Sequence, residues 1–414
     1  MKIYKVGGAV RDKLLDRKVV DHDYVVVGAT VEEMLDAGYT PVGKDFPVFL
    51  HPQTHEEYAL ARTERKVAKG YHGFEFYADA DVTLEDDLIR RDLTINAIAE
   101  DEQGVLYDPY HGIDDLNNRI LRHVSPSFAE DPLRVLRVAR FAARYADYGF
   151  SIADETMAMM QCLVDHDEVD ALVAERVWQE VEKALSDDNP WIFFNVLRQC
   201  GALARLFPEI EQLFGVPQAA QWHPEIDTGL HTMMVLEQSA RLSKESVVRF
   251  AALLHDLGKG TTPEEEWPRH IGHEARSVPL VNTVCQRLKV PKHFTALASL
   301  VAEFHLNYHR IDELKNSTIV DLLSRLDSFR RPERFEHFLL ACEADAKGRT
   351  GYENSSDEKT QHFRAFFHAA NQVKTADIIA KGFQGQEIAE QLRIKRIAAV
   401  KACKNELNGC EPCQ

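Results

Sequence analysis

Two acidic residues near the N-terminus, Asp21 and Asp23, have the side chains and spacing needed to bind divalent metal ions. They precede an apolar run at residues 24–28 that is typical of a β-strand, and side chains two residues apart on a strand share a face. Two such carboxylates, together with substrate phosphate oxygens, suit Mg²⁺ ions that assist an attacking hydroxyl and a leaving pyrophosphate. The alternative is a pair of solvated acids at the start of a strand.

A glycine pair, Gly7 and Gly8, follows a predicted strand at residues 3–6. Glycine lets the backbone approach a phosphate closely and turn its N–H groups toward it. Arg11 falls on the first turn of the predicted next helix, where its guanidinium can reach triphosphate oxygens. An ordinary strand-to-helix turn would also explain the glycines. A dinucleotide-binding fingerprint is excluded because its third glycine is missing.

Two further residues are candidates for the same site. Glu57, on a strand predicted to neighbour that of Asp23, is either a third carboxylate or a surface acid. Arg91, in the run Arg90-Arg91-Asp92, is a candidate phosphate ligand when it is combined with the two upstream motifs. Adjacent arginines can instead lie along the protein surface.

A basic helix is predicted to begin near Ser127, which has the capping-box spacing to Glu130 and is followed by a first-turn Pro132. Its arginines recur at steps of three, three and four, and so cover about a third of the circumference. They are Arg134, Arg137, Arg140 and Arg144. The residues expected to face a core are Val135, Val138, Ala139 and Ala142. Without interleaved acids the arginines repel one another unless an anion binds, so we predict a phosphate site, with a solvated basic face as the alternative.

Asp131 and Arg134 lie one helical turn apart and differ in chemistry from the other arginines of this helix. A carboxylate accepts hydrogen bonds and a guanidinium donates them, so the pair can read the Watson–Crick edge of a base. Each good bidentate contact of this kind contributes ~1–3 kcal/mol of discrimination. The pair would therefore select a nucleotide without a nucleic-acid template.

A second candidate site lies in the C-terminal half of the chain. His255 and Asp256 follow an apolar helical pattern, and a neighbouring helix can bring His231 alongside. Mixed nitrogen and oxygen ligands suit a transition metal better than Mg²⁺, and such an ion would activate water for hydrolysis of a phosphate ester. The sequence leaves the fourth ligand open. Further candidates are His270, His273, His305 and Asp345, although a surface position is the safer prediction for each histidine.

Composition limits the class of protein. At 414 residues, with 45% hydrophobic and 28% charged residues, the chain is long enough for two to four globular domains. It has no apolar run that could span a membrane and no apolar signal core, so we expect a cytoplasmic protein. Seven scattered cysteines suggest no disulfide framework, and the Cys410-x-x-Cys413 pair lacks the further ligands of a metal site. The net charge of −17 argues superficially against a nucleic-acid partner, but arginines gather near the acidic motif.

The order of the predicted elements indicates an α+β protein. Residues 1–120 have the signals of a small mixed sheet domain, including a hairpin formed by residues 46–50 and 57–61. From about residue 120 onward long helical patterns predominate. We therefore expect domains at residues 1–120, 121–215, 216–335 and 336–414.

Taken together, these motifs resemble those of one family. They are Gly7-Gly8-x-x-Arg11-Asp12, Asp21-x-Asp23, Arg90-Arg91-Asp92-x-Thr94-Ile95-Asn96 and Glu130-Asp131-x-x-Arg134. They are similar to the ordered motifs of class II, bacterial CCA-adding tRNA nucleotidyltransferases, which belong to the polymerase β superfamily. This resemblance covers about residues 1–215, and Leu93 stands where the family usually has Phe. His231 with His255-Asp256 resembles the HD phosphohydrolase superfamily, as in the multifunctional gammaproteobacterial form.

The resemblance implies roles for named residues. It implies that Asp21 and Asp23 are catalytic and bind Mg²⁺, and that Asp131 and Arg134 act as a protein template. The implied ligands of ATP and CTP are Gly8, Arg11, Arg91, Arg137 and Arg140. For the HD domain it implies a catalytic site at His255 and Asp256 that, with His231, holds a divalent transition metal such as Ni²⁺.

The implied activity is the addition of C, C and A to the 3′ end of tRNA, with 2′,3′-cyclic phosphodiesterase, 2′-nucleotidase and phosphatase activity in the HD domain. We expect a monomer, with a homodimer as the alternative. A poly(A) polymerase of the same superfamily would share the N-terminal motifs. Two other classes stay open from the residues alone: a metal phosphohydrolase whose N-terminal half only binds RNA or nucleotide, and an RNA chaperone.

Overall fold

The computed structural model describes residues 1–19, 22–42, 48–66, 74–77 and 80–409. They form two compact units, Met1–Leu206 and Phe207–Gln414. Asp21, residues 46 and 47 of the expected hairpin, and the Cys410-x-x-Cys413 pair lie outside the described residues. The finer division into four domains stays a prediction. Among the helices of the described ranges, none is long and apolar enough to cross a membrane.

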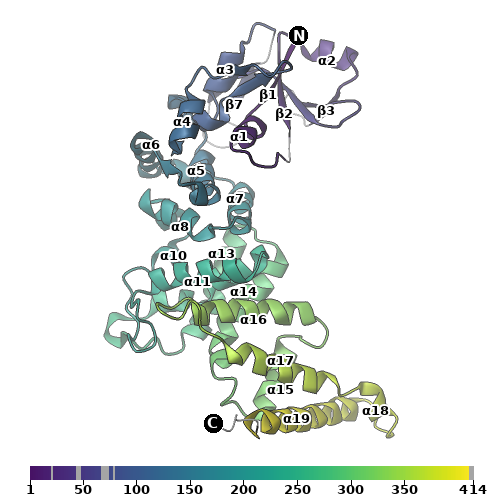
Figure 1. The fold of residues 1–414 in the computed structure, drawn as a ribbon. Helices are drawn as coiled ribbons and strands as arrows, with labels where there is room; N and C mark the ends of the chain where they lie inside the picture. The colour runs from purple at the N-terminus through teal and green to yellow at the C-terminus, as the bar shows by residue number, and fades with distance from the viewer. Residues whose placement is uncertain (20–21, 43–47, 67–73, 78–79, 410–414) are drawn as a thin grey trace. The chain divides into compact units, whose positions relative to one another are not determined.

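The first unit contains a mixed sheet of seven strands within the described residues (Figure 1). In spatial order the strands are β3 (Thr40–Val42), β4 (Val48–Leu50), β5 (Glu57–Leu60), β2 (Asp23–Val27), β1 (Lys2–Val6), β8 (Ala99–Asp101) and β9 (Leu106–Tyr107). β4 and β5 pair antiparallel, which confirms the predicted hairpin. β2 runs antiparallel to β1 but parallel to β5, so the sheet is mixed as expected.

Helices cover this sheet because both of its faces carry apolar side chains. Val6 and Val25 belong to the same buried cluster as Leu88, whereas Val26 clusters with Met34 on the other face. The helices of this part are α1 (Gly8–Leu14), α2 (Val31–Asp36), α3 (Leu84–Ile89) and α4 (Gly112–Asn118). A capping box starts both α2, at Thr30, and α3, at Thr83. A separate hairpin pairs β6 (Thr63–Lys66) with β7 (Phe74–Tyr77).

The rest of the first unit is helical apart from a short parallel pair of strands, β10 (Ile120–Leu121) and β11 (Ser151–Ile152). Its helices are α5 (Leu133–Arg144), α6 (Asp154–Asp165), α7 (Ala174–Ser186), α8 (Pro190–Gln199) and α9 (Ala202–Leu206). The apolar face predicted for α5 is confirmed, since Val135 and Val138 are fully buried.

The predicted start of the basic helix is wrong. Ser125, rather than Ser127, caps a short 3₁₀ helix at Pro126–Glu130, and α5 begins only at Leu133. Asp131 has extended backbone angles between the two helices, and its Oδ1 accepts a hydrogen bond from the N–H of Leu133. The single helix start predicted here is therefore two: Ser125 caps the 3₁₀ helix, and Asp131 lies at the start of α5.

The regular elements of the second unit are helices, apart from an isolated bridge between Pro217 and Asp227, among its described residues. Its helices are α10 (Pro208–Glu211), α11 (Thr228–Leu242), α12 (Ser246–Leu254), α13 (His273–Arg287), α14 (Lys292–His309), α15 (Asn316–Arg325), α16 (Pro332–Lys347), α17 (Glu358–Asn371), α18 (Thr375–Ile379) and α19 (Gln386–Gly409). α12 packs against α11, α14 and α16. α13 packs against α14 (Figure 1). α16 spans the predicted boundary at residue 335 and contributes to the core of the same bundle.

Candidate active sites

The turn between β1 and α1 requires a glycine at its first position. Gly7 has a φ of 65°, in the left-handed region that favours glycine, and a Cβ atom there would lie 2.9 Å from Nη1 of Arg91. Gly8 is the first residue of α1, as the glycine motif predicts. The turn therefore brings the start of α1 close to the Arg91 guanidinium, whose Nη2 also pairs with Asp87 at 3.1 Å.

Asp23 is the first residue of β2 and lies at the same end of the sheet as this turn. Its cross-strand neighbours are Val6 of β1 and Glu57 of β5. The strand predicted for Glu57 therefore does neighbour that of Asp23, and both side chains are exposed at the strand ends. Asp21 lies outside the described residues, so its position on the same face stays a prediction.

Arg11 is buried, and its guanidinium is held by several groups. Nη1 donates to Oδ1 of Asn96 at 2.5 Å, and Nε donates to Asp12 at 2.9 Å. The guanidinium carbon also lies 5.3 Å from the ring centre of Phe141 and 5.2 Å from that of Tyr145. Burial by itself would raise the pKa of Asp12, but Arg11 and the hydroxyl of Tyr145 hold it below its ordinary value.

Asp92 and Asn96 connect Arg11 to α5. The Asn96 amide donates to Oδ1 of Asp92 at 2.8 Å, and Arg137 donates from Nε to Oδ2 of Asp92 at 2.8 Å. Burial alone would raise the pKa of Asp92, but Arg137 and Asn96 hold that pKa well below its ordinary value. Neither residue is among the ligands predicted from the sequence, although both lie in the Arg90–Asn96 motif and differ from its apolar positions.

The arginines of α5 have acidic or carbonyl partners within the protein, so the inference that they repel one another unless an anion binds is wrong. Arg140 pairs with Glu180 of α7 at 2.6 Å, and Arg144 lies 3.8 Å from Asp12. Arg137 pairs with Asp92, as described above. Arg134 donates instead to the carbonyl oxygens of Ser127 and Arg90, at 2.8 and 2.5 Å. Neutralisation comes from acids on other elements, which a single-helix pattern cannot reveal.

Asp131 contacts two other elements. Besides the Leu133 N–H, its carboxylate accepts a hydrogen bond from Arg176 of α7, between Oδ2 and Nη2 at 2.9 Å. Arg176 therefore fixes the direction of the Asp131 side chain at the start of α5.

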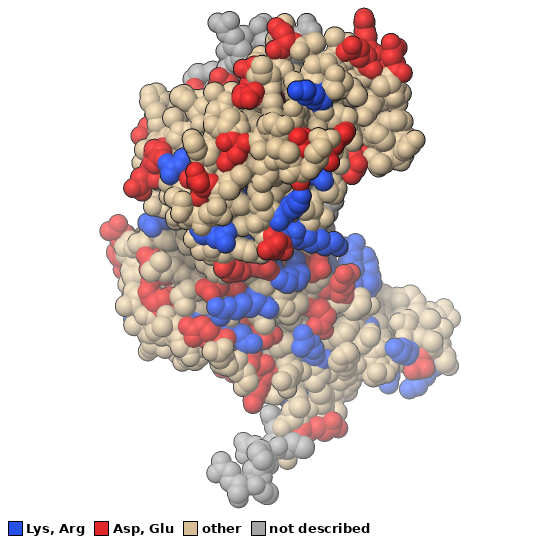
Figure 2. Space-filling view, turned by 45° about the horizontal axis from the view of Figure 1, so that its top comes forward, with Lys and Arg blue, Asp and Glu red and all other residues tan. Residues whose placement is uncertain are grey.

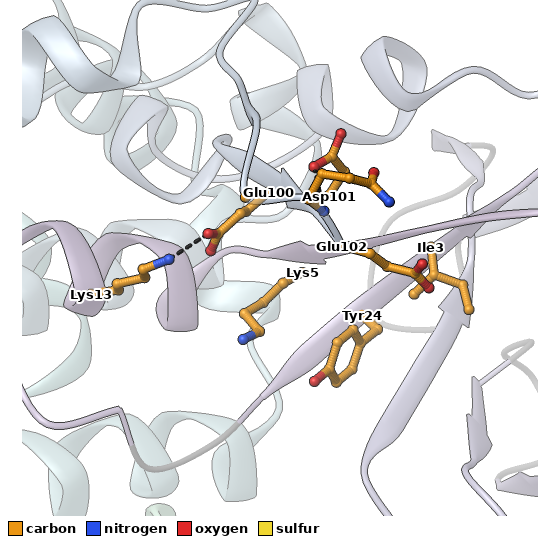
Figure 3. A pocket seen from close by; sticks show the side chains of 9 residues that line it. Ile3, Lys5, Lys13, Tyr24, Glu100, Asp101 and Glu102 are labelled. Atoms are coloured by element: carbon orange, nitrogen blue, oxygen red, sulfur yellow. Dashed lines mark hydrogen bonds and ion pairs between the residues drawn. The ribbon is translucent and has the colours of Figure 1, made fainter.

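A pocket lies on the other face of the sheet. Lys5 and Tyr24 line it, and they alternate along β1 and β2 with Val6 and Asp23, which point the opposite way. Figure 3 shows Lys13 of α1 donating to Glu100 of β8 at this pocket. None of the predicted site residues is among its lining residues.

The second unit brings together the histidines and acids of the second predicted site. Nε2 of His231 lies 3.1 Å from Oδ1 of Asp345, and Nε2 of His255 lies 3.1 Å from Oδ2 of Asp256. Nε2 of His255 is also 3.6 Å from Oδ1 of Asp345. The four side chains are buried, and they come from α11, the end of α12 and α16. Asp345, left open from sequence, thus completes a set of four candidate ligands.

These side chains are suited to bind a metal ion. Nδ1 of His231 contacts the carbonyl oxygen of Gly348 at 3.0 Å, and Nδ1 of His255 contacts that of Ala252 at 2.7 Å. Because a carbonyl only accepts, each Nδ1 donates a hydrogen bond to it, and each Nε2 faces the cluster. Nε2 of His255 and Oδ1 of Asp256 are buried without a hydrogen-bond partner. Such atoms are suited to a cation.

The electrostatics of the cluster favour positive charge. Burial alone would lower the pKa of His255, but Asp256 and Asp345 raise it to about 10. Lys259 adds a positive charge, with Nζ 2.6 Å from Oδ2 of Asp256. His309 contacts Oδ2 of Asp345 at 2.6 Å. Lys259 and His255 thus place positive charge beside the two buried carboxylates, Asp256 and Asp345.

The remaining histidines proposed from sequence divide into two kinds. His273 and His305 lie beside Asp256, at the start of α13 and within α14. His270 instead contacts the hydroxyl of Thr262 and the carbonyl oxygen of Pro217, both at 2.9 Å. All three are buried, so the alternative of surface histidines is wrong for each.

Three family models match the chain in order. The poly A polymerase head domain matches residues 3–122, the probable RNA and SrmB-binding site of polymerase A matches residues 149–214, and the HD domain matches residues 228–331. The fold and these matches define a nucleotidyltransferase that carries an HD domain.

Full-length relatives identify the family. The multifunctional CCA proteins of Thioalkalivibrio sulfidiphilus and Nitrosococcus oceani are 59% and 60% identical over 99% and 97% of this chain, and over 100% and 98% of their own lengths. The chain belongs to the family of multifunctional CCA proteins. This membership favours the CCA-adding class over the poly(A) polymerases, which share the head domain.

Solved structures agree in fold. The CCA-adding enzyme of Thermotoga maritima complexed with tRNA has a TM-score of 0.62 at 23% identity, covering 100% of this chain and 88% of its own. The Bacillus stearothermophilus CCA-adding enzyme in complex with CTP has a TM-score of 0.64 at 22% identity, covering 97% of this chain and 89% of its own.

Proposed function

We propose that this chain builds and repairs the 3′-terminal CCA of tRNA from CTP and ATP without a nucleic-acid template. We also propose that its HD domain hydrolyses phosphate esters as a 2′,3′-cyclic phosphodiesterase, a 2′-nucleotidase and a phosphatase. The observation that carries the first proposal is the register of Asp23 opposite Glu57, at the same end of the sheet as the Gly7–Gly8 turn. A carboxylate pair beside a phosphate-approaching turn is what nucleotidyl transfer needs.

In the head, Asp21 and Asp23 would hold Mg²⁺, with Glu57 as an additional acid beside them. Mg²⁺ supplies neutralisation of charge on the reacting phosphate when it is bound. The backbone at Gly8 and the side chains of Arg11 and Arg91 would bind and orient the triphosphate of ATP or CTP. The tRNA 3′-hydroxyl then attacks the α-phosphate, the bond to the β-phosphate oxygen breaks, and pyrophosphate leaves. Positioning and charge neutralisation account for most of the catalysis in such a reaction.

Arg137 and Arg140 would bind the same triphosphate by exchanging partners. Each now pairs with a carboxylate, Asp92 and Glu180 respectively. Phosphate oxygens have the same charge and accept the same bidentate hydrogen bonds, so they can compete for these guanidinium groups. Asp131 and Arg134 would read the base of the incoming nucleotide, which requires Arg134 to leave its two backbone carbonyls.

In the second unit, His231, His255, Asp256 and Asp345 would hold a divalent transition metal such as Ni²⁺. The mixed nitrogen and oxygen donors fit such an ion better than Mg²⁺. The metal supplies Lewis acidity toward a phosphate ester when it is bound. Lys259, which is buried beside Asp256, offers a positive charge for a substrate phosphate oxygen.

The tRNA body would bind through a confined basic surface, and binding would weaken with salt. Figure 2 shows Lys and Arg side chains interspersed with Asp and Glu on the face in view. We propose that the protein acts in the cytoplasm, where tRNA is processed, as a monomer, with a homodimer as the alternative.

The decisive experiment incubates the protein with tRNA lacking its terminus and with each nucleotide separately, followed by sequencing of the products. CTP alone should add cytidines, and ATP should be incorporated only after them. Failure to incorporate CTP would exclude CCA addition and favour a poly(A) polymerase.

A pair of variants tests whether both units are enzymes. Asp23→Ala should abolish nucleotide addition while phosphatase activity persists, and His255→Ala should do the converse. Addition that survives in Asp23→Ala would leave the head as an RNA- or nucleotide-binding module beside a phosphohydrolase. If Asp23→Ala retained nucleotide addition and His255→Ala retained phosphatase activity, the catalytic residues of both reactions would lie elsewhere.

A further inference from the structure

A group of exposed apolar side chains lies along the chain segment that leads into α11. Trp222, Ile226 and Leu230 are 63%, 48% and 52% exposed, and Leu230 directly precedes His231 on the first turn of that helix. Large apolar side chains scattered singly over a surface need no explanation, whereas a group of them marks a binding surface. The position of this group beside a candidate metal ligand favours a ligand that also enters the HD site.

Trp222 directly precedes the histidine that connects this surface with the buried cluster. The ring centre of His223 lies 4.6 Å from that of His231. The side chain of His223 is 19% exposed, whereas that of His231 is fully buried. Solvent therefore reaches the neighbourhood of His231 at His223, next to the most exposed aromatic side chain of this segment.

A second loop with an exposed aromatic residue is held at the same place. Oε1 of Glu225 lies 3.0 Å from Nδ1 of His223 and 3.0 Å from Nδ1 of His231. Its other oxygen, Oε2, accepts a hydrogen bond from the N–H of Thr350 at 3.3 Å. Tyr352, two residues further along that loop, is 45% exposed. One acid therefore connects two loops, each with an exposed aromatic side chain, to the same candidate metal ligand.

Backbone hydrogen bonds hold the loop of Trp222 in one conformation. The N–H of Trp222 donates to the carbonyl of Ala219 at 2.9 Å, and the N–H of Ile226 donates to that of His223 at 2.9 Å. The carbonyl of Ile226 accepts from the N–H of Gln218 at 2.7 Å. Ile226 has a φ of 62°, in the left-handed region that β-branched residues rarely adopt. Such conformations are typical of ligand-binding loops, and a loop fixed in advance loses less entropy on binding.

We infer that Trp222, with Tyr352 on the adjoining loop, binds the nucleobase of a nucleoside 2′,3′-cyclic phosphate or 2′-phosphate whose phosphate enters the HD site. The inference rests on the proposed phosphohydrolase function and identifies what recognises the part of the substrate that the metal ligands do not contact. Every base has a π-face that can stack on an exposed indole, so this recognition tolerates any base. Single-stranded RNA ends present unstacked bases of this kind.

The test compares two substrates that differ only in the base, using the full-length protein. They are 2′,3′-cyclic AMP and the 2′,3′-cyclic phosphate of methyl riboside. The parent should have the lower KM for cyclic AMP. Trp222→Ala should raise that KM on the order of 10-fold, because it removes a stacked base contact, and Tyr352→Ala should raise it less. Trp222→Phe keeps an aromatic face and should restore a KM close to that of the parent.

Two further measurements complete the test. Ile379→Ala is the matched control, since Ile379 is 54% exposed at the end of α18, and its KM values should equal those of the parent. A trinucleotide with the same cyclic terminus distinguishes the source of the ligand. A KM below that of cyclic AMP identifies an RNA end, and an equal KM identifies the free nucleotide.

Tryptophan fluorescence gives a readout apart from turnover. In a His255→Ala background, cyclic AMP should quench the emission, and the quenching should disappear when Trp222→Ala is added. Equal KM values of the parent for the two substrates, or an equal rise of both in Trp222→Ala, would overturn base recognition alone. Quenching that does not depend on Trp222 would do the same. A folded parent that hydrolyses neither substrate would overturn the proposed function of the HD unit as well.

Discussion

Nη1 of Arg11 donates a hydrogen bond to Oδ1 of Asn96 at 2.5 Å, and the amide of Asn96 donates onward to Asp92 at 2.8 Å. Asn96 can do both because an amide carries an acceptor and a donor on one side chain. The same Asp92 accepts from Arg137 of α5. One buried asparagine therefore connects a predicted phosphate ligand of the head with one of the helix that follows it.

Asn96→Ala should impair nucleotide addition by disorienting Arg11. We expect kcat to fall on the order of 100-fold, because small displacements of a positioning group have effects of this size. The measurement is single-nucleotide incorporation with CTP, and the matched control is Asn117→Ala on the exposed surface of α4. Phosphatase activity, measured on the same preparation, should not change. Equal losses in both activities would indicate misfolding rather than positioning.

Glu57→Gln tests whether the cross-strand partner of Asp23 belongs to the magnesium site. A third acid would raise metal affinity, so its neutralisation should raise the Mg²⁺ concentration needed for half-maximal addition by roughly 10–100-fold. Glu56→Gln is the control, since Glu56 precedes β5 and its carboxylate accepts a hydrogen bond from the hydroxyl of Thr54. Identical magnesium titrations for the two variants would make Glu57 a surface acid.

Glu180→Ala should destabilise the first unit because it leaves Arg140 without its carboxylate. Both side chains of this pair are buried, at 8% and 5% exposure. Loss of one partner of a buried pair costs about 3–5 kcal/mol, which urea unfolding followed by tryptophan fluorescence can measure. If Arg140 binds triphosphate as proposed, CTP should restore more stability to this variant than to the parent. Glu182→Ala on the same helix is the control.

Asp131→Asn should alter the choice between C and A more than it weakens triphosphate binding. The amide keeps an oxygen for the N–H of Leu133 but replaces an acceptor on the base-reading edge by a donor. A lost base contact of ~1–3 kcal/mol corresponds to roughly 5- to 150-fold in discrimination. Competition between CTP and ATP on defined tRNA ends measures this ratio. Unchanged selectivity, with Asp147→Ala as the control, would count against the protein-template proposal.

Asp187 should make the stability of the first unit depend on pH. Burial raises its pKa from 3.8 to about 6, although Arg144 and Arg140 oppose the shift. A folded-state pKa above the unfolded value gives stability that is present below pH ~4 and is lost as pH rises through about 6. Asp187→Asn should therefore be more stable than the parent above pH 6, by at most ~3 kcal/mol, and equal to it near pH 3. Thermal unfolding across this range is the measurement, and a constant difference at all pH values would contradict the assignment.

Local patterns in the sequence were sufficient to predict several elements. The glycine turn between β1 and α1, the β4–β5 hairpin and the apolar face of α5 are confirmed, because each depends on residues within a few positions of one another. The ordered motifs also predicted the family, which the full-length relatives confirm. The start of α5 was misassigned because Ser125 caps a separate 3₁₀ helix, whereas Asp131 accepts the hydrogen bond at the start of α5.

Tertiary structure alone decided which groups meet. The carboxylate partners of Arg137 and Arg140 lie 45 and 40 residues away in the sequence. Asp345 reaches His231 across 114 residues. A periodic pattern records which side of its own helix a residue occupies, but the partner that faces it depends on how separate helices pack. For this reason the sequence determined the kinds of ligand available, and only packing selected the set that shares a buried centre.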